Sequence, residues 1–278
     1  MAFDNDRGGL LTRRMDDESK LETPESSDSA EFARAQFARD GYVVVRGLVD
    51  IETCRHARRS VMDALDPLLG PAEFEADVGY PGAPSSRDVA GGRTPRRLFN
   101  AASRFPMLAE WATGAAVRRE LSGLFGRRDV WLSQCHHNCI MTKYPGYSSA
   151  TLWHQDIRYW SFDRPELISV WAALGDETRD NGALKIIPGS HRLDLDRGRF
   201  DRGLFLRPDL PENKMLIDRA EDVIMAPSDV LFFHCRTFHA AGKNRTDTVK
   251  LSGVFTYHTE DNRPIPGTRS DLLPSLPL

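Results

Sequence analysis

The segment Trp153-His154-Gln155-Asp156 holds an imidazole and a carboxylate two residues apart. Residues two apart in a β-strand point to the same face, with Cβ atoms roughly 7 Å apart, so both side chains can reach one metal ion. Two histidines and one carboxylate on one face of an octahedral ion form the facial triad of non-haem iron oxygenases. The triplet alone is weak support, because about one such match is expected by chance in a chain with eight histidines.

The third ligand of such a triad must come from a distant strand, and four histidines are candidates. Three of them lie in a turn, inside an apolar run and at the end of the last expected strand: His191, His234 and His258. His239 follows an apolar strand and opens a turn that contains Gly and Asn, so it should lie at a barrel mouth that a substrate can reach. We therefore predict that His239 completes the triad.

A basic residue on the last expected strand has the charge to bind the distal carboxylate of a co-substrate such as 2-oxoglutarate. Lys250 and Ser252 lie two residues apart and share one face of that strand. If that face is the inner one, the lysine is a buried charge that needs an anionic partner. If the face is exposed to solvent, no partner is needed, and the spacing alone leaves both alternatives open.

The elements that must position these residues change in character along the chain. Helical periodicity covers residues 29–39, 51–69 and 106–124, and a first strand covers residues 42–46. From residue 129 short apolar or alternating runs are separated by turns, as in an antiparallel sandwich or barrel. The expected strands are 129–144, 151–160, 167–174, 183–187, 222–225, 229–235 and 249–258. We predict a mainly β core with flanking helices from the N-terminal third.

Two polar segments are candidates for the borders of the site, because long irregular stretches in compact proteins are usually functional or mobile. Residues 72–98 are dense in Gly, Pro, Ser and Arg, and they are expected to form a lid that includes Tyr80, Arg96 and Arg97. Residues 192–216 are expected to form the opposite rim. If the strand that carries the metal triplet continues, its next alternate side chains also face the metal. The predicted substrate-binding residues are Phe99, Arg158 and Trp160.

Length and charge bound the class of protein. The 278 residues are enough for one large core, and we predict a disordered tail over residues 1–28 and a single domain over residues 29–278. A net charge of −3 gives no electrostatic reason to expect nucleic acid or an anionic membrane as a partner. The amino-terminal segment has no apolar signal region and no apolar run is long enough to cross a bilayer, so we expect a cytoplasmic protein.

Several spaced motifs resemble the phytanoyl-CoA dioxygenase-like (PhyH) family of Fe(II)/2-oxoglutarate oxygenases, from about residue 31 to residue 258. The matching segments are the family's opening, its first metal motif, its most recognisable internal stretch and its second metal segment: residues 37–45, 153–156, 180–191 and 228–239. Because these motifs occur in the family's order, the match is more specific than any one of them.

The resemblance implies a double-stranded β-helix (jelly-roll, cupin-like) core in which iron is held by His154, Asp156 and His239. It implies Fe(II), 2-oxoglutarate and O₂ as cofactor, co-substrate and oxidant, and an intact aspartate favours hydroxylation over halogenation. The residues that it places near 2-oxoglutarate are Gln134, Asn138, Trp171, Lys250 and Ser252. The family usually has Arg where this chain has Lys250, and a lysine pairs with a carboxylate only as a point charge. Arg245 is the alternative anchor.

The predicted reaction is therefore hydroxylation of an unactivated C–H bond in a small organic molecule, either lipid-like or a specialised metabolite. Two alternatives stay open. A non-catalytic metal-binding jelly-roll protein has no need for an open iron face, and a polypeptide hydroxylase needs a wide groove. The sequence makes no prediction of the oligomeric state.

Overall fold

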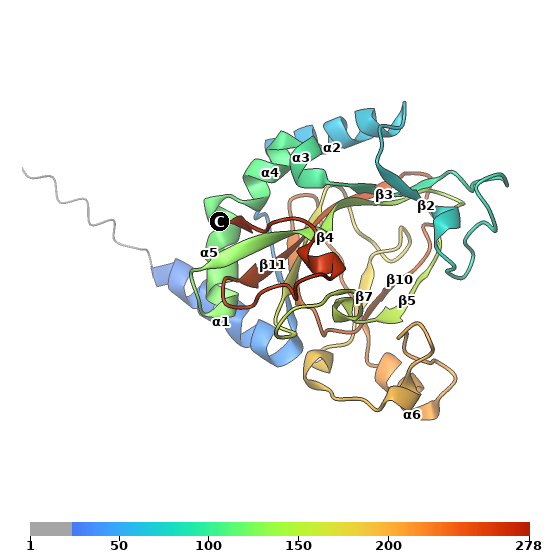
Figure 1. The fold of residues 1–278 in the computed structure, drawn as a ribbon. Helices are drawn as coiled ribbons and strands as arrows, with labels where there is room; N and C mark the ends of the chain where they lie inside the picture. The colour runs from blue at the N-terminus through green and yellow to red at the C-terminus, as the bar shows by residue number, and fades with distance from the viewer. Residues whose placement is uncertain (1–23) are drawn as a thin grey trace, which may run out of the picture.

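The computed structural model describes residues 24–278. Helices dominate the first half of this range (Figure 1). The elements in order are α1 (Pro24–Asp40), β1 (Tyr42–Val45), α2 (Ile51–Leu65), β2 (Ala72–Phe74), η1 (Glu75–Asp77), β3 (Pro95–Phe99), α3 (Ala101–Arg104), α4 (Pro106–Ala112) and α5 (Ala115–Phe125).

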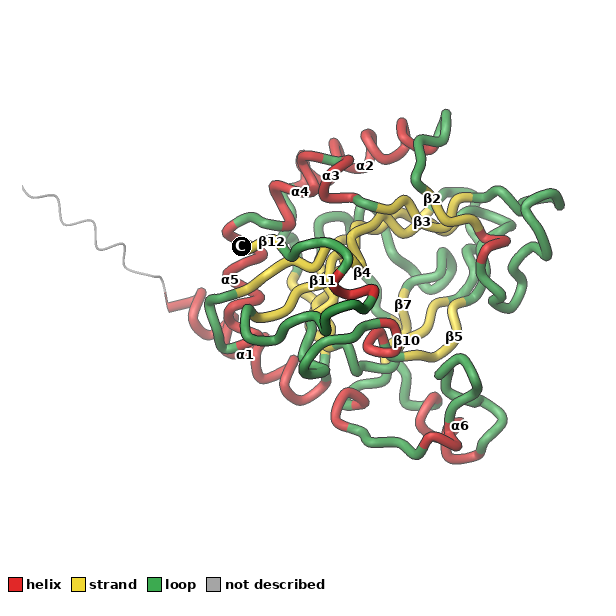
Figure 2. The backbone as a smooth tube through the Cα atoms, in the orientation of Figure 1, coloured by secondary structure: helices red, strands yellow, loops and turns green. Residues whose placement is uncertain are grey.

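Strands and short 3-10 turns make up most of the remainder, and α6 lies apart from the sheets in an extended insertion (Figure 2). These elements are β4 (Val130–Lys143), β5 (Thr151–His154), η2 (Asp156–Tyr159), β6 (Ile168–Ala173), β7 (Leu184–Ile186), η3 (Ser190–Arg192), η4 (Arg197–Arg199), α6 (Pro211–Ile217), β8 (Glu221–Asp222), β9 (Val230–His234), β10 (His239–Ala241), β11 (Lys250–Thr259), η5 (Arg269–Asp271) and β12 (Leu276–Pro277).

The strands form two antiparallel sheets and not one closed barrel. The larger sheet has the order β1-β9-β6-β11-β4-β3-β2, with β12 paired to β4, and the smaller sheet has the order β5-β10-β7-β8. In Figure 1 the strands β5, β7 and β10 of the smaller sheet lie together, apart from β2 and β3 of the larger one. This arrangement confirms the predicted mainly β, jelly-roll fold with flanking helices.

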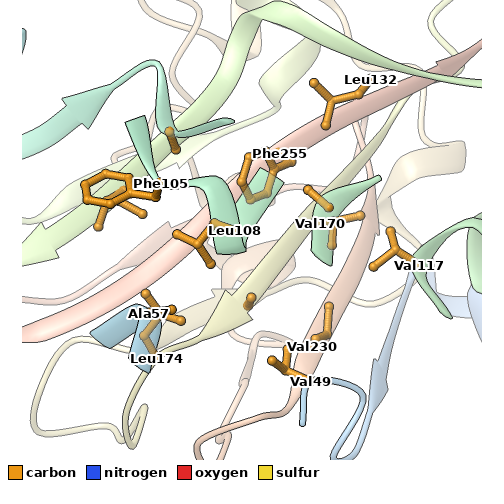
Figure 3. Packing of buried hydrophobic residues seen from close by; sticks show 14 of the residues in the cluster. Val49, Ala57, Phe105, Leu108, Val117, Leu132, Val170, Leu174, Val230 and Phe255 are labelled. Atoms are coloured by element: carbon orange, nitrogen blue, oxygen red, sulfur yellow. The ribbon is translucent and has the colours of Figure 1, made fainter. Parts of the chain in front are cut away.

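The larger sheet is buried on both faces, and β6 shows why its sequence is apolar throughout. Val170 belongs to the cluster that packs with the helices, whereas its neighbour Trp171 belongs to the cluster between the two sheets. On the helical side, Leu108 of α4 lies beside Phe255 of β11, and Val117 of α5 lies on the side of Val170 (Figure 3). Burial on both faces holds the central strands rigidly in place, and those strands carry several residues of the site described below.

Helix α2 illustrates how local sequence fixes this helical layer. The Asp50 side chain accepts a hydrogen bond from the Thr53 backbone N–H at 2.8 Å and so caps the first turn. The buried positions along the helix recur at helical spacing: Cys54, Ala57, Val61, Ala64 and Leu65. The expected helix over 106–124 is in fact two, α4 and α5, because Gly114 adopts an extended conformation between them.

Three expectations about the strands were wrong in detail. The strand expected over 151–160 ends at His154 and turns into η2. His239 opens a short strand, β10, where a turn was expected, because it pairs on both sides with β5 and β7. The segment 72–98 is not irregular throughout, since β2 and β3 pair with each other and β3 extends the larger sheet along β4.

At the amino-terminal end, α1 begins at Pro24, inside the segment that was expected to be a disordered tail. Residues 1–23 of that tail lie outside the described residues, so the predicted domain boundary stays a prediction. Within residues 24–278, none of the helices is both long and apolar enough to span a membrane.

Candidate metal centre and its cavity

The pairing of β5 with β10 brings the first two candidate ligands together. His154 and His239 are direct partners in the antiparallel register, and their ring centroids lie 4.2 Å apart. Opposed residues in such a pair project from the same face of the sheet. A register irregularity follows at once, between His239 and Ala241, so the close approach is confined to the two histidines.

Backbone carbonyls fix the orientation of both imidazole rings. His154 Nδ1 lies 2.8 Å from the Leu152 carbonyl oxygen, and His239 Nδ1 lies 3.0 Å from the Thr237 carbonyl oxygen. Because a carbonyl only accepts, each Nδ1 carries the proton and each Nε2 presents its lone pair. The two Nε2 atoms point to Asp156, at 3.7 Å and 3.5 Å from its Oδ1.

Asp156 completes the group at the start of η2, where its side chain is fully buried. Its Oδ2 accepts a hydrogen bond from Ser169 Oγ at 2.7 Å, whereas its Oδ1 has no hydrogen-bond partner within residues 24–278. A buried carboxylate oxygen without a partner is costly, and a cation beside it removes that cost. One ligand atom from each of the three residues lies within 4.8 Å of the others, so the trio fits a single metal ion.

The protonation states suit metal binding. Burial lowers the pKa of His154 to about 3, so its imidazole is neutral at physiological pH. Burial alone would raise the pKa of Asp156, but the neighbouring His137 and His239 outweigh it and hold that pKa well below its usual range. Burial would also lower the pKa of His239, but Asp156 outweighs it and raises that pKa. The site therefore offers a carboxylate, a neutral imidazole at His154, and an imidazole at His239 whose Nε2 gives up any proton it carries when a divalent metal binds.

The three candidate ligands line a cavity of about 230 Å³ between the two sheets. Four of the residues predicted from the sequence to bind co-substrate or substrate also line it: Phe99, Trp160, Trp171 and Lys250. Much of one wall comes from the segment 72–98, through Glu73, Glu75, Tyr80, Arg96 and Arg97. That segment was expected to be a lid, and in the structure it is a wall built on β2, η1 and β3.

Gln134 and Asn138 lie outside this cavity, contrary to the role that was expected for them. Gln134 Nε2 donates to the Pro274 carbonyl at 2.7 Å, and Asn138 Oδ1 accepts from the Ala102 backbone N–H at 2.8 Å. The cause is a register shift in β4, where Asn138 pairs with Phe255 but the next residue of β11 pairs with Ser133. Strict alternation therefore fails here, and His136 and His137 face the cavity instead.

Arg158 and Ser252 also take positions other than those expected. Because η2 replaces the expected strand, the Arg158 guanidinium packs 3.7 Å from the ring centroid of Phe205, in the insertion after η4, and does not line the cavity. Ser252 is fully buried behind the cavity wall, where its hydroxyl donates to Glu177 Oε1 at 2.5 Å. Arg245, the alternative anchor, does not line the cavity either.

Lys250 does line the cavity, but it already has a carboxylate partner. Its Nζ lies 2.9 Å from Oε2 of the fully buried Glu177. Glu177 Oε1 also accepts a hydrogen bond from Trp171 Nε1 at 2.7 Å. The lysine and the tryptophan were predicted from their positions in the sequence, whereas the glutamate that joins them was not.

Other residues that face the site were also missed. His137 Nδ1 lies 3.7 Å from Asp156 Oδ2, and Lys143 is half-buried in the cavity wall. The pair of adjacent histidines in β4 was a sequence signal that could have identified His137. Nothing in the residue spacing distinguished Lys143, Ser169 or Glu177 from other polar residues. Their roles depend on which strands become neighbours.

Comparison with known proteins agrees with this fold. The ectoine dioxygenase of Sphingopyxis alaskensis is 26% identical over 246 residues, which cover 82% of this chain and 76% of that protein. Among solved structures, the nogalamycin epimerase SnoN in complex with Fe³⁺ and α-ketoglutarate superposes with a TM-score of 0.68 at 22% identity, covering 91% and 96% of the two chains. The S. alaskensis enzyme with 2-oxoglutarate and 5-hydroxyectoine gives 0.67 at 21% identity, covering 89% and 82%.

The family model for phytanoyl-CoA dioxygenase matches residues 37–252, which is most of the chain and confirms the resemblance seen in the motifs. The chain belongs to the phytanoyl-CoA dioxygenase (PhyH) family.

Proposed function

We propose that this protein is a non-haem Fe(II)- and 2-oxoglutarate-dependent dioxygenase that hydroxylates an unactivated C–H bond of a small organic molecule. His154, Asp156 and His239 are the iron ligands. The observation that carries the proposal is the unpartnered, buried Oδ1 of Asp156, which faces two imidazole nitrogens that are free to bind a metal. The names of the relatives and the ligands of the solved structures support the same cofactors.

The dimensions of the cavity support a small molecule as substrate over a polypeptide. A cavity of about 230 Å³ is somewhat smaller than typical small-molecule sites, which run from roughly 300 to 1,000 Å³. Its lining is mixed, with the aromatic rings of Phe99 and Trp160 beside the guanidinium groups of Arg96 and Arg97. A polypeptide substrate stays the alternative, and a cytoplasmic location stays a prediction.

Each part of the site has a role in the proposed reaction. When iron, 2-oxoglutarate and O₂ are bound, they supply the oxidising chemistry that converts C–H to C–OH. The carbonyls of Leu152 and Thr237 hold the two imidazoles in the tautomer that binds metal, and Ser169 orients the carboxylate of Asp156. The buried aromatic residues exclude water from the reacting centre.

The proposal is tested by anaerobic visible spectroscopy. The wild-type protein with Fe(II) should develop a weak charge-transfer band when 2-oxoglutarate is added, because the co-substrate chelates the metal. His154→Ala should abolish the band, since it removes one of three ligands.

His191→Gln is the control, because His191 is a partly buried histidine that lies outside the cavity lining. It should keep the band at full intensity. A wild-type protein that shows no band with Fe(II) and 2-oxoglutarate would refute the proposed function. A non-catalytic metal-binding protein would bind Fe(II) through the same residues without the response to 2-oxoglutarate.

A further inference from the structure

Lys250 is the residue at which the sequence predicts the anchor for 2-oxoglutarate, but its charge is already balanced. The side chains of Lys250 and Glu177 are 3% and 0% exposed, and their charged atoms lie 2.9 Å apart. A second carboxylate on Lys250 would place two like charges on one buried cation, which is unfavourable in a site with little water. The anchor end of the cavity therefore needs another positive charge.

Lys143 is the cation in the right place. In the register of β4 and β11 it is the direct partner of Lys250, so both side chains project from the same face of the larger sheet. Both lysines line the cavity that holds the candidate iron ligands. Lys143 Nζ donates to the Ser149 carbonyl oxygen at 2.9 Å and forms no ion pair within the described part of the chain.

The charged groups around Lys143 leave its charge uncompensated. Arg96 and Lys250 repel it, while Glu75 and Glu177 attract it. Arg96 and Arg97 share the carboxylate of Glu73. Counted together, the four cations and three carboxylates of this cluster leave one positive charge in excess. Burial, followed by the two repulsive neighbours, lowers the pKa of Lys143 to about 7. A half-buried cation of this kind is stabilised when an anion binds beside it.

Gly182 makes room for the Lys143 side chain. Its backbone has a φ of +82°, and a Cβ at this position would lie 2.8 Å from Lys143 Cδ and 2.7 Å from the Gly242 carbonyl oxygen. Any larger residue at 182 would therefore displace the lysine or the backbone. Glycine in the turn before β7 thus leaves space for the Lys143 side chain along the cavity wall, and Gly182 itself lines the same cavity.

We propose that Lys143 supplies the positive charge that binds the distal carboxylate of 2-oxoglutarate, while Lys250 stays paired with Glu177. This inference rests on the proposed function and assigns the co-substrate anchor of the same site. In this arrangement the Trp171–Glu177–Lys250 network forms a neutral polar floor that adds no net charge to the anchor end.

The test compares two five-carbon 2-oxo acids, 2-oxoglutarate and 2-oxopentanoate, which differ in the distal carboxylate. Their dissociation constants are measured from the charge-transfer band of the anaerobic Fe(II) protein. Wild type should bind 2-oxoglutarate about ten- to hundredfold more tightly, because a hydrogen bond to a charged group is strong. Lys143→Met and Lys143→Gln should both reduce this preference to less than about threefold, while 2-oxopentanoate still binds.

Two controls remove the competing cations. The double variant Glu177→Gln/Lys250→Met replaces a charged pair of zero net charge by an uncharged pair. Arg96→Met removes a guanidinium that lines the same cavity and repels Lys143. Both variants should keep the preference. The inference is overturned if both Lys143 variants keep the preference, or if either control abolishes it. If the wild-type protein binds both acids equally, the assignment of Lys143 is overturned but the proposed function is not. If the wild-type protein gives no band with either acid, the proposed function itself is contradicted.

Discussion

The two ends of the cavity solve different electrostatic problems. At the metal end, Asp156 Oδ1 has no hydrogen-bond partner within residues 24–278, and the neighbouring imidazoles present lone pairs to the same point. At the anchor end, Glu177 and Lys250 satisfy each other, and Trp171 and Ser252 donate to the same carboxylate. The first end has the form of a site that needs a cation, and the second has one cation, Lys143, beyond those that its own carboxylates balance.

The two ends also differ in how the chain builds them. The metal end uses two residues of one short segment and one cross-strand partner, all held by local backbone contacts. The anchor end draws Lys143 from β4, Lys250 from β11 and Glu177 from the loop after β6. An ion pair assembled from separate elements depends on tertiary packing, so changes at this end should affect folding as well as binding.

The largest expected effect is a loss of folding stability when the ion pair at the anchor end is broken. Glu177→Gln leaves the charge of Lys250 buried without its carboxylate, so the free energy of unfolding of the metal-free protein should fall by about 3–5 kcal/mol. Adding Lys250→Met should restore most of the loss, because the unpaired charge is then gone. Chemical denaturation of the three variants and wild type measures the cycle. If Glu177→Gln is as stable as wild type, the buried ion pair does not support the fold as described.

The metal end, which is built from local segments, could be predicted from the sequence, whereas the anchor end, which is built from distant elements, could be predicted only in part. His154, Asp156 and His239 were identified because a two-residue spacing and a strand end are visible in the sequence, and the structure brings all three together. The fold class was equally accessible, since short apolar runs separated by turns mark an antiparallel sandwich.

The remaining parts of the site depended on contacts that the spacing does not reveal. Gln134 and Asn138 were assigned by strict alternation, which the register shift of β4 interrupts. Arg158 was assigned on a strand that ends at His154. Glu177 lies in a loop, and its pairing with Lys250 spans 73 residues. Tertiary packing determines where bulges, strand ends and long-range ion pairs occur. The local sequence pattern therefore assigned the first three side chains to the wrong face of a strand and gave no signal for Glu177.

A smaller effect tests whether the metal end relies on its hydrogen bonds as well as its ligands. Ser169 Oγ donates to Asp156 Oδ2, so Ser169→Ala should weaken Fe(II) binding by about 10- to 100-fold, as loss of such a supporting contact does at other metal sites. Anaerobic Fe(II) titration measures the change.

Thr256→Val is the matched control for this substitution. Thr256 is the direct partner of Ser169 across β6 and β11, and its buried hydroxyl has no hydrogen-bond partner within residues 24–278. Its removal should leave Fe(II) affinity unchanged within about threefold. Equal losses in Ser169→Ala and Thr256→Val would show that general packing of the sheet, and not the bond to Asp156, sets the affinity.

The smallest expected effect is a pH dependence that belongs to the anchor end alone. The pKa of Lys143 is lowered to about 7, mainly by burial, with Arg96 and Lys250 opposing its charge and Glu75 and Glu177 favouring it. Only protonated Lys143 attracts the distal carboxylate, so the preference for 2-oxoglutarate over 2-oxopentanoate should be constant below about pH 7 and fall by up to about tenfold per pH unit above it. The ratio of the two dissociation constants removes titration at the metal end, because both acids chelate iron through the same atoms. In Lys143→Met the ratio should not change with pH, and a wild-type ratio that is constant from about pH 6 to about pH 9 would remove Lys143 as the source of the charge.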